Sequence, residues 1–509
     1  MVICGVRVLY IATDDKLSQA AVNQSTRKYF VANLRGTIYD CNGSPITELN
    51  TKPVTVIFPT EKGSITLSNM LDGEELLSAE KLLSQGSPVT INGACPDGSG
   101  GAVTLDVPIR YSGSLSHILG YIDSTGHGVT GIEKSLDNIL YNSTPLSVSY
   151  STDSLGHMLA GEGFSINNNQ PKNSVTLTID NNIQKIVENA MSNVTAGAAV
   201  VVEAESGKIR ASVSRPDYDQ NNVAAFLNSE NSPLINRALY TYNIGSVFKP
   251  CLAAAAIENG EANFENECLG SISSGELTFK CHKIEGHGLL DLKGAIAESC
   301  NTYFYNLSTK LGAKKVYNAA KKLRFGEELN LGGGIISNKG NVPSLETLEN
   351  SEASLINLSI GQGDLLLSPI ALSCLYTAIV NKGKYLLPTL IEGISENGVY
   401  KEQSIGLPTY AMSENTANIL KKYLENALIN GTGHSGYSEG ILAGGKTGTA
   451  QTGWKDGDRN ILNGWFCGFY EGLYKTYVIV ILKEDVKSGS ADCAPIFKTI
   501  TEQIKFIGY

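Results

Sequence analysis

Two pairs of strand signals, far apart in the sequence, constrain the fold more than any other feature. Residues 197–203 and 208–214 form one pair, joined by a short turn, and residues 464–470 and 476–482 form the other. The run from 477 to 482 is apolar on both faces of a strand, which predicts helices on both sides of it. Helices are expected between the pairs and again at 496–504. The sequence therefore predicts a sheet assembled from distant strands and sandwiched by helices.

Length and charge narrow the possibilities. A chain of 509 residues is too long for one ordinary core, so two or three domains are expected. Hydrophobic residues make up 42% and charged residues 18%, which is typical of globular proteins. The net charge of −10 argues against a nucleic-acid partner, because such a partner requires a basic surface.

The N-terminal region predicts an α+β unit without a catalytic cluster of its own. Residues 2–12 are apolar except for Arg7, and they are about half as long as a membrane span. They are either the outer end of a membrane helix or a buried N-terminal turn or strand. The expected elements that follow are a hairpin at 35–43, a strand at 53–59, a helix at 68–83, a loop and helix at 128–140, a linker at 159–173, a strand at 175–179 and a helix capped by Asp180.

Three short motifs carry the chemistry. The first is Ser246-Val-Phe-Lys249, which follows a glycine and is expected to open a helix that ends near Gly260. Ser246 and Lys249 would then share one helix face, within reach of each other. About two Ser-x-x-Lys strings are expected by chance in a chain of this length, so this motif alone would more often be a helix cap with a solvated lysine.

The second and third motifs follow in order. Ser299-Cys-Asn301 is expected in a tight turn between two helices, although both residue types also favour plain turns. Lys446-Thr-Gly448 is expected on a strand, where Gly448 would let a substrate backbone approach closely. Together the three motifs supply a nucleophile, a base, a proton relay and a cation that can hold a carboxylate. This set suits acyl transfer from a peptide or amide that ends in a carboxylate.

The three motifs, in this order, resemble those of serine β-lactamases and penicillin-binding proteins. The chain is similar over nearly its whole length to class B penicillin-binding proteins, the monofunctional peptidoglycan D,D-transpeptidases. Two departures are Ile244, where proline is usual, and Cys41, where arginine is usual. Further resemblances to that family lie at 35–43, 131–133, 177–180, 214–217, 236–238, 360–363, 431–433 and 446–451.

The resemblance implies a domain organisation. It predicts an α+β multidomain chain whose C-terminal part has the serine β-lactamase/transpeptidase-like fold, an antiparallel sheet sandwiched by helices. Residues 1–12 would be the remnant of a membrane anchor, 13–165 a pedestal ("dimer") domain and 166–509 the penicillin-binding transpeptidase domain. The implied location is the outer face of the cytoplasmic membrane.

The resemblance also implies residue roles. Ser246 would attack the penultimate D-alanine of a stem peptide, and Lys249 would take its proton once burial and the charge of Lys446 have lowered its pKa. Ser299 would relay the proton to the departing D-alanine, and Asn301 would orient Lys249 and the substrate. The backbone N–H groups of Ser246 and Thr449 would form the oxyanion hole. The group expected to bind the substrate comprises Lys446, Thr447, Gly448 and Thr449.

Two other functions stay open at this point. A β-lactamase or D,D-carboxypeptidase would use water for deacylation, but the string at 326–330 has glycine where a class A β-lactamase needs its glutamate base. A non-catalytic β-lactam sensor or scaffold would not need the complete set of catalytic residues. The implied partners are peptidoglycan stem peptides ending in D-Ala-D-Ala, β-lactams as inhibitors, the membrane and a SEDS-family glycan polymerase.

The ten cysteines and six histidines show no zinc-like spacing, so no metal and no cofactor is expected. Cys268 and Cys281 flank a turn-rich stretch and are either a disulfide or two ordinary thiols. His287 and His434 are expected to be structural.

Overall fold

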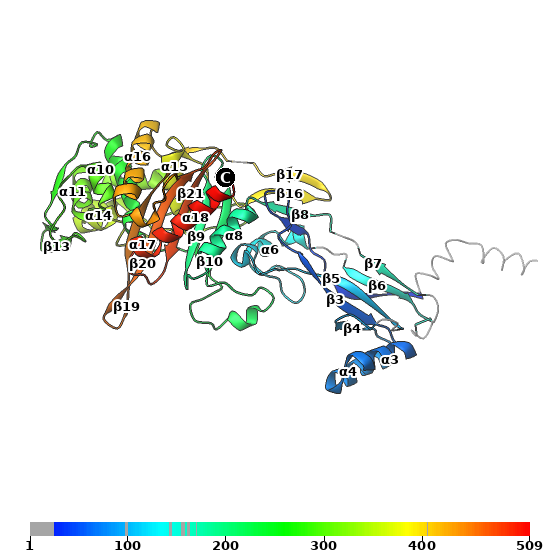
Figure 1. Cartoon of the computed structure of the whole chain (residues 1–509). Helices are drawn as coiled ribbons and strands as arrows, with labels where there is room; N and C mark the ends of the chain where they lie inside the picture. The colour runs from blue at the N-terminus through cyan, green and yellow to red at the C-terminus, as the bar shows by residue number, and fades with distance from the viewer. Residues whose placement is uncertain are drawn as a thin grey trace, which may run out of the picture.

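The computed structural model describes residues 25–96, 100–141, 145–153, 158–159, 163–168, 171–404 and 406–509. The described part of the chain is elongated: a large C-terminal domain lies at one end and a smaller N-terminal unit extends from it (Figure 1). The apolar run at 2–12 lies outside the described residues. Among the helices that are described, none is both long and apolar enough to cross a bilayer.

The C-terminal domain is built on a five-stranded antiparallel sheet with the strand order β10-β9-β21-β20-β19. Its first hairpin comes from one end of the domain and its last three strands from the other, as the sequence predicts. The strands are β9 (Gly197–Glu203), β10 (Ile209–Arg215), β19 (Ala443–Asp456), β20 (Arg459–Glu471) and β21 (Thr476–Lys483).

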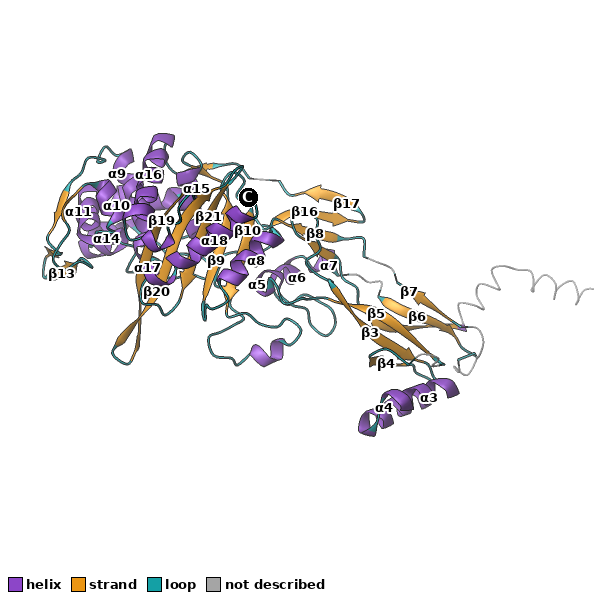
Figure 2. Cartoon of the chain, viewed as in Figure 1, coloured by secondary structure: helices purple, strands orange, loops and turns teal. Residues whose placement is uncertain are grey.

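Side chains of the central strands alternate between two cores because successive residues of a strand point to opposite faces. Val200 and Val480 pack into the larger core, with the helical lobe. Val201 and Ile479 pack into the smaller core, against the two helices that cover the other face. Figure 2 shows these layers, with α8 (Asn181–Ala190) and α18 (Ala494–Phe506) on one face and α15 (Pro369–Val380) and α16 (Glu414–Asn430) on the other. The predicted sandwich is confirmed.

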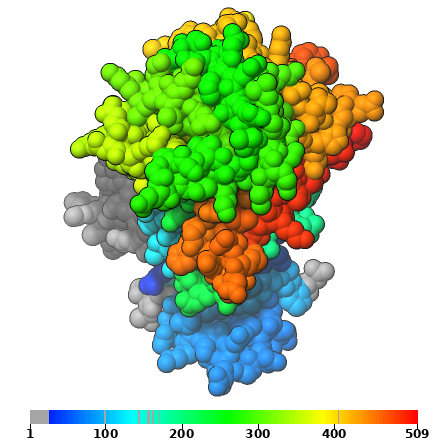
Figure 3. Space-filling model, turned by 90° about the vertical axis from the view of Figure 1, so that its left-hand side faces the viewer, coloured from blue at the N-terminus to red at the C-terminus, as the bar shows by residue number. Residues whose placement is uncertain are grey.

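The helical lobe lies between the two strand pairs in sequence. Seen from the end of the domain, it fills the upper part of the molecule in green, with the β19–β20 hairpin in orange below it (Figure 3). Its elements are α9 (Lys249–Glu258), β11 (Asn266–Cys268), β12 (Ser271–Ser274), β13 (Leu277–Lys280), β14 (Gly288–Leu290), α10 (Leu292–Ala297), α11 (Asn301–Leu311), α12 (Ala313–Lys322), α13 (Leu345–Asn350) and α14 (Glu352–Ser359).

The N-terminal unit contains two small sheets and two helices. Its three-stranded sheets are β1-β6-β7 and β4-β3-β5. The helices α3 (Glu61–Met70) and α4 (Gly73–Ser84) pack against β3 and β4. The strands are β1 (Thr26–Ala32), β3 (Asn50–Ile57), β4 (Val89–Asn92), β5 (Ala102–Ile109), β6 (Leu146–Ser151) and β7 (Phe164–Asn167).

A mixed sheet and a short helical segment join the two parts. β2 (Thr37–Tyr39) pairs in parallel with β8 (Ser174–Leu177), which pairs with β16 (Ile391–Glu396), and β17 (Val399–Glu402) completes the sheet. The helical segment comprises α5 (Ser116–Leu119), α6 (Gly131–Ser135) and α7 (Asp137–Leu140). Its apolar side chains belong to the same core as the C-terminal domain, so the junction is packed rather than loosely linked.

A buried charge cluster fixes this junction. The carboxylate of Glu133, fully buried, accepts from Arg35 Nε at 2.9 Å and from Arg110 Nε at 2.7 Å. Arg35 also contacts Asp137 at 2.8 Å, and Arg110 contacts Glu48 at 3.0 Å. The segments at 35–43 and 131–133, which resemble separate landmarks of the family, are therefore held together by one ion-pair network.

Candidate active site

Ser246 lies in a single 3₁₀ turn, Gly245–Phe248, immediately before α9. The sequence predicts instead that Ser246 is part of the helix. The difference follows from Pro250, which has no N–H to donate to the Ser246 carbonyl; the N–H of Lys249 donates to that carbonyl and tightens the turn. Ser246 itself is half-buried.

Two backbone segments hold this turn in place. The N–H of Gly245 donates to the Gly361 carbonyl at 2.8 Å. Gly245 has a φ of +62°, and a Cβ at this residue would lie 2.6 Å from the Thr449 carbonyl oxygen. Only glycine fits here, because the backbone is left-handed and the space is already filled. The turn at 245–248 is therefore packed between β19 and the loop at 360–363.

Lys249 is fully buried and connects the first motif to the second. Its Nζ donates to the Ser299 carbonyl at 2.7 Å, to Ser299 Oγ at 3.3 Å and to Asn301 Oδ1 at 2.7 Å. The predicted convergence of Lys249, Ser299 and Asn301 is thus present in the structure. Each of these three hydrogen bonds goes to the Ser299–Asn301 turn.

The second motif forms the turn between α10 and α11, as predicted. Ser299 is 8% exposed and has a φ of +55°, a conformation that is costly for a residue with a side chain. Cys300 precedes the first residue of α11, and Asn301 begins that helix. The turn is held in this conformation by Lys249 on one side and by the packing of Cys300 on the other.

The third motif lies on β19, which is the edge strand of the sheet. Lys446 is fully buried, and its Nζ donates to Thr432 Oγ1 at 3.3 Å and to the Thr447 carbonyl at 3.2 Å. Thr447 Oγ1 donates to Thr432 Oγ1 at 2.9 Å. Thr449 Oγ1 accepts from the Gly489 N–H at 3.1 Å.

The structure gives a reason for glycine at position 448 that the sequence does not predict. A Cβ at Gly448 would lie 2.9 Å from the Ile244 carbonyl oxygen and 3.0 Å from Val247 Cγ1. The missing side chain therefore makes room for the turn that contains Ser246. The approach of a substrate backbone to Gly448 stays a prediction.

Burial disfavours the charged state of both lysines. Burial lowers the pKa of Lys249 to about 7. Burial, and then the positive charge of Lys249, hold the pKa of Lys446 well below its ordinary value. Since two buried cations without a carboxylate partner are unfavourable, neutral Lys249 is accessible near neutral pH.

Sequence reasoning missed Thr432, although it noted the string 431–433 as a resemblance. Thr432 contacts both Lys446 and Thr447, and its carbonyl accepts from Ser490 Oγ at 2.8 Å. The glycines on each side of Thr432 are the signal that could have revealed it. A Cβ at Gly431 would clash with the carbonyl of Ala297, two residues before Ser299, so the glycine allows this close packing.

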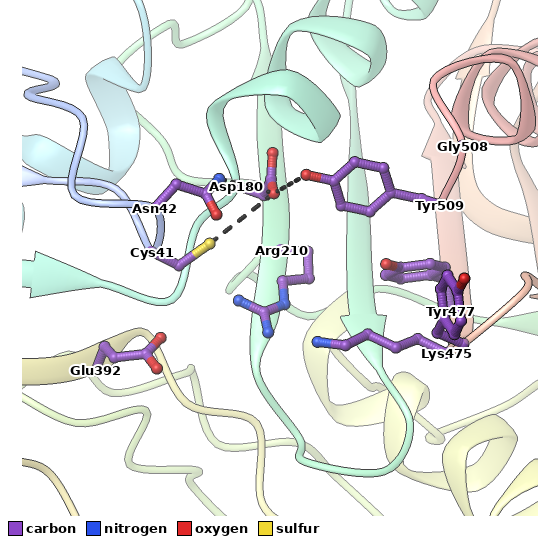
Figure 4. A pocket seen from close by; sticks show the side chains of 10 residues that line it. Cys41, Asn42, Asp180, Arg210, Glu392, Lys475, Tyr477, Gly508 and Tyr509 are labelled. Atoms are coloured by element: carbon purple, nitrogen blue, oxygen red, sulfur yellow. Dashed lines mark hydrogen bonds between the residues drawn. The ribbon is translucent and has the colours of Figure 1, made fainter.

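A separate cavity of about 450 Å³ lies at the junction of the two parts of the chain and is not this site. Figure 4 shows the Asp180 carboxylate above Arg210, with Cys41 and Asn42 on one side of it and the Tyr509 hydroxyl on the other. Asp180 Oδ2 accepts from Asn42 Nδ2 at 3.1 Å and from the Tyr509 hydroxyl at 2.7 Å. No lining residue comes from the three motifs. The cavity lies between the turn at 40–44 and the C-terminal residues 508–509.

Comparison with known proteins agrees with this geometry. Residues 197–502 match the family described as "Penicillin binding protein transpeptidase domain". The chain belongs to the penicillin-binding protein transpeptidase family. Stage V sporulation protein D of Bacillus subtilis is 28% identical, over 96% of this chain and 80% of that protein. Peptidoglycan D,D-transpeptidase FtsI of Buchnera aphidicola (strain Bp) is 26% identical, over 76% and 68%.

Solved structures share the fold of this transpeptidase. Penicillin-binding protein 3 of Mycobacterium tuberculosis in complex with aztreonam is 22% identical, with a TM-score of 0.68 over 94% of this chain and 97% of that chain. The D,D-transpeptidase domain of a peptidoglycan glycosyltransferase from Eggerthella lenta is 23% identical, with a TM-score of 0.67 over 94% and 99%. The predictions of a class B penicillin-binding protein, of its fold and of a serine-type D,D-transpeptidase activity in peptidoglycan synthesis are confirmed.

Proposed function

We propose that Ser246 is the nucleophile of the transpeptidase and that Lys249 is its general base. Ser246 Oγ attacks the carbonyl of the penultimate D-alanine in a stem peptide, and its proton passes to neutral Lys249. The carbon–nitrogen bond to the terminal D-alanine then breaks, and Ser299 passes a proton to the departing amine. An amine from a second stem peptide attacks the ester, which forms the cross-link and restores the Ser246 hydroxyl.

The observation that carries this proposal is the position of the Lys249 amine. It is buried one helical turn from Ser246 and donates to both Ser299 and Asn301. The N–H groups of Ser246 and Thr449 form the oxyanion hole in this proposal. Lys446, Thr447 and Thr449 bind the terminal carboxylate, whose negative charge would favour the protonated form of Lys446.

A cross-linking assay tests the proposal. Wild-type protein with glycan strands made from lipid II should give cross-linked muropeptides, detected by mass spectrometry, and penicillin should abolish them. Ser246→Ala should give none, while Ser404→Ala, at an exposed serine of the same domain, should match wild type. Cross-links formed at the wild-type level by Ser246→Ala would refute the nucleophile. Free D-alanine without cross-links would indicate a carboxypeptidase.

The pH profile of acylation tests the role of Lys249. A base must be neutral to accept a proton, and the pKa of Lys249 is lowered to about 7. The second-order rate constant for acylation by a fluorescent penicillin should therefore rise through about pH 7 and level off above it. A rate that is flat between pH 5.5 and 8.5, about 1.5 units on either side of that pKa, would contradict this assignment.

The proposal also covers the domain organisation, the location and the partners of the enzyme. Residues 13–165 act as a pedestal domain and 166–509 as the transpeptidase domain, a division supported by the family match within the second part. The enzyme works at the outer face of the cytoplasmic membrane, where its substrate is assembled, and a SEDS-family polymerase supplies the glycan. A structure of penicillin-binding protein 2 with MreC from Helicobacter pylori, with a TM-score of 0.69 to this chain, supports partner binding by this fold. Protease accessibility in intact spheroplasts tests the location.

A further inference from the structure

Three thiols and one imidazole converge beside the second catalytic motif. Their ligand atoms all lie within 4.8 Å of one another. They come from the segment that runs from β11 to the start of α11, which folds back on itself through the β11–β14 pair. The four residues are Cys268, Cys281, His287 and Cys300.

The distances match a tetrahedral metal site. His287 Nδ1 lies 3.4 Å from Cys268 Sγ and 3.6 Å from Cys281 Sγ. In a tetrahedral zinc site, with zinc–sulfur bonds of about 2.3 Å and zinc–nitrogen bonds of about 2.0 Å, the sulfur–nitrogen separation is about 3.5 Å. These two nitrogen–sulfur distances therefore match those of a four-coordinate zinc ion.

One ring nitrogen of His287 has no hydrogen-bond partner among the described residues, and metal binding at the other nitrogen would explain its position. The side chain of His287 is 2% exposed, and its Nε2 has no hydrogen-bond partner among the described residues. A metal on Nδ1 places the proton on Nε2, which faces Glu298 Oε2 at 4.0 Å. Metal-binding histidines usually donate their second N–H to such a carboxylate.

The three sulfurs belong to buried thiols, one of which accepts a backbone N–H. The three thiols are between 0% and 3% exposed, and among the described residues they are free rather than joined as a disulfide. The backbone N–H of Asn301 donates to Cys281 Sγ at 3.4 Å. Three thiols and one imidazole are soft, borderline ligands, and a tetrahedral arrangement of them suits zinc.

We propose that these four residues bind one zinc ion in a closed structural site. Because all four coordination positions are filled by protein, the ion would have no position for water or substrate. Zinc would fix Cys300 from one side of the Ser299–Asn301 turn while the sulfur of Cys281 fixes the Asn301 N–H. The ion would thus hold the strained turn to which Lys249 donates. This site does not depend on the proposed catalytic roles.

Metal analysis of the full chain, purified without chelators, tests the site. We expect about one zinc per chain by elemental mass spectrometry, since a closed site of this kind retains its metal. Replacement by cobalt should give the visible bands of tetrahedral cobalt and a near-ultraviolet sulfur-to-cobalt charge-transfer band. These readouts do not require transpeptidase activity.

Ligand variants assign the metal to these residues. Cys268→Ala and His287→Ala should each lower zinc retention against a competing chelator by roughly tenfold or more. Cys374→Ala, at a buried thiol outside the cluster, should retain zinc as wild type does. Should the variants fail to fold, wild-type protein stripped of metal should regain thermal stability on addition of zinc.

Three results would overturn the proposal. The first is a reduced, folded wild-type chain that contains no zinc and takes none up. The second is a Cys268–Cys281 disulfide in the chain isolated from cells, detected by alkylation without reductant. The third is zinc that both ligand variants retain as tightly as wild type.

Discussion

Lys249→Met is expected to slow acylation by a β-lactam by about a thousandfold, which is within the range that a positioned general base contributes. The side chain of methionine fills similar space but cannot accept the Ser246 proton. The rate constant is measured by stopped-flow or gel-based labelling with a fluorescent penicillin. The residual rate should no longer rise through about pH 7, the pKa to which burial lowers Lys249.

Two comparisons separate this effect from unfolding. Lys314→Met, at an exposed position of α12, should acylate at the wild-type rate. The melting temperature of Lys249→Met should change little, because the lost hydrogen bonds and the avoided burial of an ammonium oppose each other. A Lys249→Met rate within about tenfold of wild type would refute the base assignment.

Glu133→Gln is expected to destabilise the junction of the two parts by about 3–5 kcal/mol, as the loss of one member of a buried ion pair does elsewhere. Glu133 is fully buried between Arg35 and Arg110, so its neutralisation leaves two buried guanidinium groups with less compensation. The free energy of unfolding is measured by denaturant titration, with tryptophan fluorescence and circular dichroism as separate probes, because a multidomain chain need not unfold in one step.

An exposed acidic residue supplies the control. Glu80→Gln on α4 should change the free energy of unfolding by less than about 0.5 kcal/mol. If Glu133→Gln were as stable as Glu80→Gln, the ion-pair network would not be what fixes the junction. Labelling of Ser246 by penicillin in folded Glu133→Gln should persist, because the network does not contact the three motifs.

The central sheet and the order of the motifs could be predicted from the sequence because their signals are local. The β-branched runs at 197–203 and 477–482 fix strands by periodicity, and the apolar character of both faces predicts the two helical layers. Asp180 was correctly expected to cap a helix, and its carboxylate accepts from Asn182 and Ile183. The contacts of Lys249 with Ser299 and Asn301 could be predicted from the chemistry of the motifs.

Boundaries were less predictable where one residue overrides a pattern. The helix expected at 68–83 is two helices, because Gly73 has a φ of +57° and Asp72 starts a new helix. The linker expected at 159–173 contains β7, which pairs with β6. Its alternation, Phe-Ser-Ile-Asn, covers only four residues within a polar stretch, and pairing with a neighbouring sheet makes it a strand.

Contacts between distant residues could not be predicted. Arg35 and Glu133 are 98 positions apart, and neither local sequence indicates that the two side chains are in contact. The four ligands beside the second motif are spaced irregularly, at 268, 281, 287 and 300, so no zinc-like pattern marks them. Their convergence depends on the pairing of β11 with β14, which local sequence does not indicate.

The identity of the acylated residue tests the central claim most directly. The full-length protein is incubated with a β-lactam, digested and mapped by tandem mass spectrometry. Our account predicts one adduct, carried by Ser246 and absent from Ser246→Ala. An adduct on Ser299 or on any other residue, or no stable adduct on a folded chain, would contradict it.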